Sequence, residues 1–170
     1  MTKDSTHSVL DACCGTRMMW FDKEDSRVLY IDNRDAVFVV DKRSTPCTKG
    51  RSPRVVAPDL VACFTQLPYD SGSFFHVVFD PPHLLPRKNP DSVIRFNYGQ
   101  LNENWKEEIE KGFSECFRVL KPGGTLIFKW SETDIKVKEI LQLTPEKPLY
   151  GHKSGKASKT HWIAFIKEPS

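Results

Sequence analysis

The stretch FFHVVFDPPH, residues 74–83, joins a run of apolar residues to an acid, two prolines and a histidine. Its first six residues are apolar except for His76, a pattern typical of a strand that is covered on both faces. Proline fixes its own φ and pushes the preceding residue toward extended backbone, so Pro81 and Pro82 should form a stiff turn. The stretch therefore predicts a buried strand that ends by holding Asp80 at a fixed angle.

Other apolar runs of strand length recur along the chain and alternate with helical patterns. Apolar residues at helical spacing predict a helix from Asn102, its N-cap, to Leu120, and a short helix over Ile135–Leu141. Val37–Val40 is compatible with either a short strand or part of a helix. The expected strands are Ser8–Cys13, Arg27–Asp32, Leu60–Phe64, Phe74–Phe79, Thr125–Trp130 and Trp162–Lys167, and the expected loops are 41–54 and 86–99.

Strands that alternate with helices imply an α/β fold with a mostly parallel sheet and helices on both faces. Such sheets bind their ligands outside the carboxyl ends of the strands. Asp11, Asp32 and Asp80 each follow a predicted strand. We therefore expect three acids at one edge of the sheet, which favours a ligand site there over a purely structural role.

The loop DACCGT, residues 11–16, can be interpreted in two ways. Gly15 can take a positive φ and lets the backbone approach a ligand closely, so the loop could cradle a cofactor that contains a nucleoside. A plain turn between a strand and a helix explains the same residues. The loop is neither a G-x-G-x-x-G fingerprint nor a P-loop, which disfavours a dinucleotide. Asp32, about 20 residues later, suits ribose hydroxyls.

The turn DPPH has the geometry needed to hold a planar amine. The Asp80 carboxylate and the Pro81 carbonyl could each accept one N–H of an exocyclic amino group and so orient its nitrogen. The His83 ring could stack on the base that carries the amine, although a solvent-facing turn histidine fits as well. The structural alternative for the whole motif is a proline-rich strand terminator.

Length and composition restrict the class of protein. A chain of 170 residues with 39% hydrophobic content suits one globular domain, residues 1–170. No apolar run reaches the roughly 20 residues of a membrane helix, and no secretory signal is visible, so we expect a cytoplasmic protein without membrane contact. The five cysteines show no C-x-x-C spacing and are expected to be reduced thiols. No metal is implied.

Four segments together resemble a known family over nearly the whole chain. They are DACCG (11–15), YID (30–32), VFDPPH (78–83) and FSECFRVLKPGGTLIFKW (113–130). Their order resembles the class I methyltransferases that use S-adenosylmethionine, and DPPH resembles the (Asp/Asn/Ser)-Pro-Pro-(aromatic) motif of the amino-methyltransferases. The resemblance implies a Rossmann-like three-layer sandwich whose mostly parallel twisted sheet has an antiparallel C-terminal strand.

The resemblance also assigns site residues. The target amine would be held by Asp80, Pro81, Pro82 and His83. Asp32 would hold the ribose, and Asp59 or the adjoining Ala62–Cys63 would border the adenine. The implied cofactor-binding residues are Asp11, Ala12, Cys13, Gly15, Asp32, Asp59 and Cys63.

The chain departs from the family pattern in three places. Arg17 stands where the glycine loop usually has a further glycine, and His83 stands where the motif usually has Tyr, Phe or Trp. The smaller His83 ring titrates at pH ~6.5 when unperturbed, so if it stacks on the base, activity should fall as the ring becomes charged. The segment before the first strand is too short for the helix that normally closes the cofactor pocket, which segment 86–99 or 147–160 would then cover.

The formal charge of +3 does not identify a partner, but the basic residues cluster in loops 42–54, 87–95 and 147–161. Basic loops with nearby aromatic residues suit a nucleic acid whose target base is flipped out of its stack. We therefore expect methylation of adenine N6 in RNA or DNA, with RNA favoured. The alternatives are a protein amide or small-molecule N-methyltransferase, and a cofactor-binding non-catalytic subunit. An activating protein partner is also possible.

Overall fold

The computed structural model describes residues 6–40, 52–86, 93–155 and 157–169. Seven strands form one sheet in the order β5-β2-β1-β6-β7-β9-β8, and β3 and β4 form a separate hairpin. Within the large sheet β9 runs opposite to the other strands, because its pairings with β7 and β8 are antiparallel and the remaining pairings are parallel. The strands are β1 Val9–Asp11, β2 Val28–Asp32, β3 Ala36–Val40, β4 Ser52–Val56, β5 Leu60–Val61, β6 Phe74–Phe79, β7 Leu120–Ser131, β8 Tyr150–Lys153 and β9 Thr160–Ile166.

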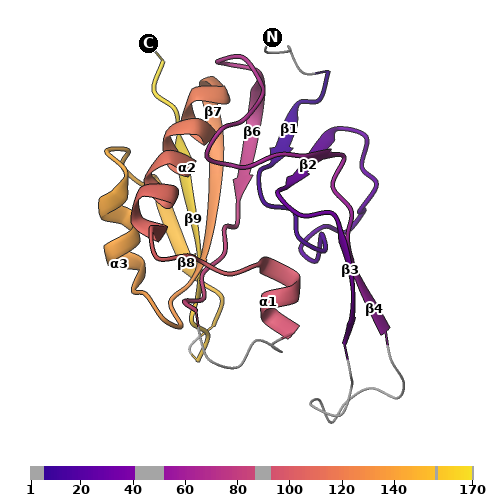
Figure 1. Ribbon diagram of the computed structural model, residues 1–170. Coiled ribbons are helices and arrows are strands. Elements are labelled where there is room, and N and C mark those ends of the chain that lie inside the picture. The colour runs from indigo at the N-terminus through magenta and orange to yellow at the C-terminus, as the bar shows by residue number, and fades with distance from the viewer. Residues whose placement is uncertain (1–5, 41–51, 87–92, 156, 170) are drawn as a thin grey trace.

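Two helices cover one face of this sheet, as Figure 1 shows. The helices are α1 Val93–Tyr98, α2 Trp105–Val119, α3 Val137–Ile140 and the short 3₁₀ helix η2 Leu141–Leu143. Both α2 and α3 pack their apolar residues against the strands, whereas α1 lies beyond the carboxyl ends of the parallel strands, next to the β3–β4 hairpin (Figure 1). The Rossmann-like, mostly parallel sheet with an antiparallel C-terminal strand is therefore confirmed.

The second helical layer differs from the prediction. Within the described residues, the segment after β1 forms turns instead of a helix, and the β3–β4 hairpin follows β2. On this face Trp20 packs edge-on against Tyr30 with their ring centroids 5.3 Å apart. A loop anchored by aromatic residues thus covers the sheet next to β1 and β2, where helices were expected.

Aromatic side chains fill the core between α2 and the sheet. Phe113 of α2 contacts Phe79 of β6 and Phe128 of β7, with ring centroids 5.4 Å and 4.8 Å apart. Each of these rings is at most 1% exposed, and full burial of such a side chain contributes about 1.5–3 kcal/mol. Gly112 lets α2 approach closely, because a Cβ at this position would lie 2.6 Å from Phe79 and 2.8 Å from Phe64.

Several boundaries differ from the sequence predictions for local physical reasons. Helix α2 begins at Trp105 after Asn104, because the Asn102 side chain accepts the Asn104 N–H and turns the chain before the helix. The KPGG segment lies inside β7, where Gly123 takes a φ of 74° and the pairing with β6 shifts register.

Three elements appear where loops were expected. Strand β4 occupies the end of loop 41–54, helix α1 the end of segment 86–99, and strand β8 part of the basic segment 147–161. The ambiguous run Val37–Val40 belongs to a strand, β3, which pairs with β4. No helix in the described ranges is long and apolar enough to cross a lipid bilayer.

Candidate functional site

The three acids singled out in the sequence lie at one edge of the sheet. Asp11 ends β1, Asp32 ends β2, and Asp80 directly follows β6. These three strands are parallel neighbours, so their carboxyl ends meet as predicted. All three residues are at most 5% exposed. Buried carboxylates require partners, and their partners define what each acid can do.

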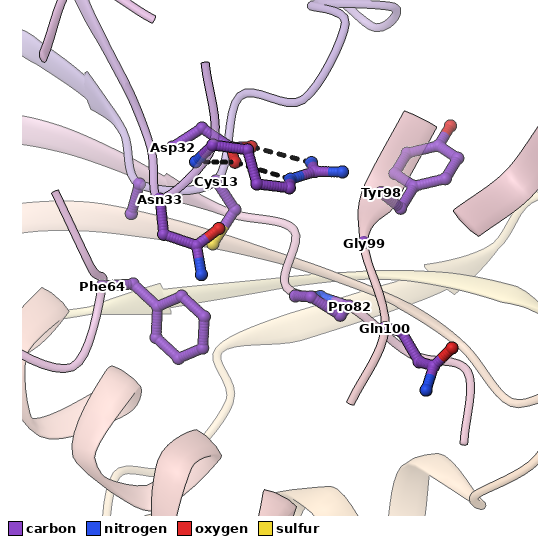
Figure 2. Close-up of a pocket in the computed structure, with 10 residues that line it drawn as sticks. Cys13, Asp32, Asn33, Phe64, Pro82, Tyr98, Gly99 and Gln100 are labelled. Carbon is purple, nitrogen blue, oxygen red and sulfur yellow. Dashed lines mark hydrogen bonds and ion pairs between the residues drawn. The ribbon is translucent and has the colours of Figure 1, made fainter. Parts of the chain in front are cut away.

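A cavity opens at this edge between the strand ends and α1, and Figure 2 shows its walls. It brings three predicted cofactor residues, Ala12, Cys13 and Asp32, to the same space as Pro82 of the DPPH turn. The wall opposite them belongs to the end of α1 and the residues that follow it. The full lining consists of Ala12, Cys13, Asp32, Asn33, Arg34, Phe64, Pro82, Tyr98, Gly99 and Gln100.

Asp32 is the most heavily bonded group of the cavity. Its Oδ2 accepts the Gly15 N–H at 2.9 Å. The Arg34 guanidinium forms a fork with the carboxylate, with Nε 2.8 Å from Oδ1 and Nη2 3.0 Å from Oδ2 (Figure 2). Arg34 also donates from Nη1 to the Phe96 carbonyl of α1 at 3.1 Å. A ligand that uses Asp32 must therefore displace Arg34.

Only glycine fits at position 15. Gly15 has a φ of 50°, and a Cβ there would collide with the backbone carbonyl of Asn97 in α1. The glycine therefore serves two purposes: it turns the loop back toward Asp32 and it lets α1 approach the carboxyl edge. This contact joins the loop after β1 to the wall formed by α1.

Arg17, which stands where the resembled pattern has a further glycine, adopts a backbone conformation typical of glycine. Arg17 takes a φ of 52°, a conformation that glycine adopts readily and that other residues avoid. Its guanidinium is anchored by the Lys23 and Ala57 carbonyls, at 2.6 Å and 2.8 Å, and by the Asp59 carboxylate at 2.9 Å. It also stacks over the Tyr30 ring at 3.9 Å. These contacts compensate for the backbone strain.

Asp11 holds the loop in place. Its Oδ1 accepts the Cys13 N–H at 3.2 Å, and its Oδ2 accepts the indole N–H of Trp20 at 2.7 Å. Burial raises the pKa of Asp11 to about 7, although both hydrogen bonds favour the ionised form. Both oxygens are thus occupied by the protein itself, which indicates a structural contribution to the site.

Asp80 has one occupied and one vacant oxygen. Lys129 of β7, which the sequence reasoning did not single out, donates to Oδ2 at 2.6 Å. Oδ1 is buried and has no hydrogen-bond partner. Burial raises the pKa of Asp80 to about 6, while the Lys129 ammonium acts in the opposite direction. An unsatisfied buried acceptor is costly and needs a physical explanation. Asp80 itself does not line the cavity, to which the DPPH turn contributes Pro82.

His83 packs inside the protein against other aromatic rings. It is 7% exposed, and its ring lies 5.4 Å from Tyr98 and 6.2 Å from Trp130 between centroids. Burial and the Lys129 ammonium lower the pKa of His83 to about 4. The imidazole is therefore neutral at pH values where a free histidine is already protonated, so any loss of activity on its protonation is expected only in more acidic solution. The role of His83 at the target amine stays a prediction. The aromatic side chains that line the cavity belong to Tyr98 and Phe64, whereas His83 does not line it.

The residues predicted to border the adenine have other contacts. Asp59 accepts the Arg17 guanidinium and the Tyr30 N–H, at 2.9 Å each. The Cys63 thiol lies 3.1 Å from the Thr65 hydroxyl. Neither residue is part of the cavity lining, to which the adjacent Phe64 belongs. Their role in cofactor binding stays a prediction, and Phe64 is the better placed side chain.

The predicted basic loops are described only in part. Residues 42–51 and 87–92 and Lys156 lie outside the described residues. Lys153 of β8 is exposed and pairs with Glu132, as does His161 of β9. Arg95, expected on the surface, is 9% exposed and donates to the Leu85 carbonyl at 3.4 Å. The exposed lysines that the structure places in segment 147–161 are Lys147, Lys153 and Lys159.

Comparison with known proteins supports the fold. No family model and no curated protein matches the sequence. Among solved structures, PH0226 from Pyrococcus horikoshii OT3 aligns over 94% of this chain and 81% of that protein, with a TM-score of 0.54 and 15% identity. A methyltransferase from Methanosarcina mazei that depends on S-adenosylmethionine aligns over 95% and 92%, with a TM-score of 0.51 and 13% identity.

A third neighbour is the 1,6-didemethyltoxoflavin-N1-methyltransferase of Burkholderia thailandensis, which contains its substrate and S-adenosylhomocysteine. It aligns over 94% of this chain and 70% of that protein, with a TM-score of 0.52 and 14% identity. The chain therefore has the fold of class I methyltransferases that depend on S-adenosylmethionine.

Proposed function

We propose that this protein transfers the methyl group of S-adenosylmethionine to a planar exocyclic amine, specifically N6 of adenine in RNA or DNA. The observation that carries the proposal is the vacant Oδ1 of Asp80, a buried acceptor in a rigid Pro-Pro turn at the carboxyl edge of the sheet. A cofactor of the methyltransferase fold and a target amine would meet at this edge.

The residues of the cavity fit the cofactor. Asp32 would accept the ribose hydroxyls once Arg34 has left it, and the Phe64 ring offers an apolar surface for the adenine. Ala12 and Cys13 would border the methionine portion. Burial raises the pKa of the Cys13 thiol well above its usual range, so this thiol is uncharged and does not compete as a nucleophile. When bound, S-adenosylmethionine supplies an electrophilic methyl group.

The protein contributes alignment. Oδ1 of Asp80 would accept one N–H of the amine and the Pro81 carbonyl the other, which orients the nitrogen lone pair. An ionised Asp80 is required, because a protonated carboxyl would place a hydrogen atom where an acceptor is needed. Tyr98, on the cavity wall, would stack on the base that carries the amine. The proton released from the amine can pass to Asp80.

The surface supports a nucleic acid as the substrate. Lys147, Lys153 and Lys159 are exposed, and the hairpin of β8 and β9 that carries Lys153 also carries Trp162. The Trp162 ring lies 5.5 Å from the Lys129 ammonium, which pairs with Asp80. The basic hairpin therefore begins close to the DPPH turn, as phosphate contacts around a flipped base require. RNA is favoured because its unstacked bases occur in single-stranded loops.

A second candidate is a small-molecule N-methyltransferase. The Burkholderia thailandensis neighbour is an N1-methyltransferase of 1,6-didemethyltoxoflavin and has that compound bound. The cavity of this chain is walled by α1 through Tyr98 and Gly99, which suits a compact ligand.

The experiment that tests the proposal is incubation of the purified protein with S-adenosylmethionine that carries a tritiated methyl group, together with separate pools of RNA, DNA and small metabolites. Asp80→Asn serves as the matched control. We expect label in the RNA or DNA pool, in N6-methyladenosine or its deoxy counterpart after nuclease digestion, and on the order of 100-fold less label with Asp80→Asn. Label confined to the metabolite pool would favour the second candidate. The absence of label from every pool, in a sample that binds the cofactor, would refute catalysis by this chain alone.

A further inference from the structure

We propose that Lys129 is a positioning residue for Asp80, which holds one carboxylate oxygen and leaves the other as the acceptor for the target amine. The inference deepens the proposed function and rests on it. It adds a residue that neither the DPPH motif nor the strand-end pattern identified. The evidence comes from the sheet register, from the surroundings of the ammonium and from the charges near Asp80.

The register of the sheet places Lys129 beside Asp80. Strands β6 and β7 are parallel, with Phe79 opposite Phe128, so the next residue of each strand also faces the other. Side chains alternate along a strand, and the neighbours Phe128 and Trp130 are both buried in the core under α2 and α3. Lys129 must therefore project from the opposite face, where Asp80 Oδ2 lies 2.6 Å from Nζ.

The ammonium group is held from three sides. Besides Asp80, Nζ lies 4.7 Å from the centroid of the Tyr98 ring of α1 and 5.5 Å from that of Trp162 of β9. Both distances are within the range of a cation–π interaction. The Lys129 side chain is 14% exposed, so little water competes for these contacts. A long lysine chain with fixed partners loses much of its freedom and can define the orientation of Asp80.

The charges around Asp80 make this lysine necessary. Asp11 of β1, when ionised, carries the same negative charge as Asp80 and repels it. Tyr98 and the neutral His83 supply no positive charge. Among the groups described around Asp80, Lys129 supplies the positive charge. Because burial raises the pKa of Asp80 to about 6 even with Lys129 present, removal of the ammonium should raise this pKa further. Burial by itself would lower the pKa of Lys129, but Asp80 and Tyr98 together raise it above its ordinary value and keep the lysine charged.

The test is the titration of Asp80 in three variants. Lys129→Met removes the charge and keeps the apolar stem, Lys129→Arg keeps the charge, and Lys111→Met on the exposed face of α2 is the matched control. Carboxyl carbons are followed by ¹³C NMR, with Asp80 assigned from Asp80→Asn. Thermal unfolding checks that each variant folds, and Lys129→Gln replaces Lys129→Met if that variant does not.

We expect Asp80 to titrate near pH 6 in the parent and in Lys111→Met. In Lys129→Met its midpoint should rise by about one pH unit or more, and Lys129→Arg should return it toward the parent value. The acidic limb of the pH profile of methyl transfer should shift with the NMR midpoint. An unchanged midpoint in Lys129→Met, with active parent protein, overturns the inference but not the proposed function. A shifted midpoint in a protein that methylates no substrate overturns the proposed function but supports the role of Lys129.

Discussion

Replacement of Gly112 by alanine tests whether the close approach of α2 shapes the cofactor cavity. Alanine in a helix interior is favoured over glycine by about 1 kcal/mol. The added Cβ, however, would lie 2.6 Å from the Phe79 ring and 2.8 Å from the Phe64 ring, and overpacking of a core costs about 1–3 kcal/mol. Since two rings are met at once, we expect a net loss of about 1–2 kcal/mol in the free energy of unfolding.

The affinity for S-adenosylmethionine should also show which of the two aromatic rings moves to make room for the added Cβ. Phe79 is completely buried and packed against Phe113 and Phe128, whereas Phe64 borders the cavity and has room to move. Gly112→Ala should therefore push Phe64 into the cavity and weaken the binding of S-adenosylmethionine.

Urea denaturation and calorimetric titration of the cofactor measure the two effects. Ser114→Ala is the matched control, because Ser114 is exposed on the same helix and its replacement meets no ring. We expect Ser114→Ala to retain the parent stability or exceed it slightly. A Gly112→Ala protein that is about 1 kcal/mol more stable than the parent, as helix propensity alone predicts, would refute the packing argument.

Four further predictions concern the acids and Arg34. Asp80→Asn should lower methyl transfer on the order of 100-fold with cofactor affinity nearly unchanged, measured by turnover and calorimetry; equal loss of both would rule out contact with the amine. Asp32→Ala should weaken the cofactor roughly 10- to 100-fold, and parent-like affinity would contradict the ribose assignment. Arg34→Met should tighten cofactor binding, because no guanidinium then has to leave Asp32; weaker binding would show that Arg34 contacts the cofactor. Finally, the unfolded chain releases the Asp11 proton near pH 3.8 and the folded protein near pH 7. Ionisation of Asp11 should therefore lower stability as the pH rises through this range, and urea unfolding at several pH values should show a smaller decrease for Asp11→Asn; identical pH dependence would refute the raised pKa.

Much of the fold could be predicted because continuous apolar runs such as those of β2 and β6 are seldom compatible with anything but buried strands. The elements that were missed depend on distant partners. Strand β4 contains Ser, Pro and Arg and forms only by pairing with β3. The paired residues of the two strands lie 12 to 20 positions apart in the sequence. Helix α1 has six residues and is held by Phe96, which stacks on Phe38 at 4.9 Å. Local sequence carries no signal for such contacts.

The residues of the candidate site were also predicted only in part. The convergence of Asp11, Asp32 and Asp80 follows from strand direction alone, so the sequence was sufficient. Lys129 was missed because its importance depends on the face of β7 from which its side chain projects. Arg34 was missed because its paired hydrogen bonds to Asp32 form only in the folded protein. A signal existed for Lys129: it is a lone charge between Phe128 and Trp130 in a strand that is otherwise apolar at this end. A charge in such a position demands a buried partner.

The position of β9 determines when the sheet can be completed. Strand β9 inserts between β7 and β8, and it follows all the other strands that the described residues form. Until residues 160–166 leave the ribosome, β7 has one edge of unpaired backbone N–H and C=O groups, although Asp80 and all the residues that line the cavity have already been synthesised. Exposed strand edges invite pairing with other chains. A truncation before Thr160 would therefore cause aggregation while leaving Asp80 and every cavity-lining residue in the sequence. A loss of activity in such a protein would report on the sheet edge and on the missing Trp162, and not on the residues of the cavity.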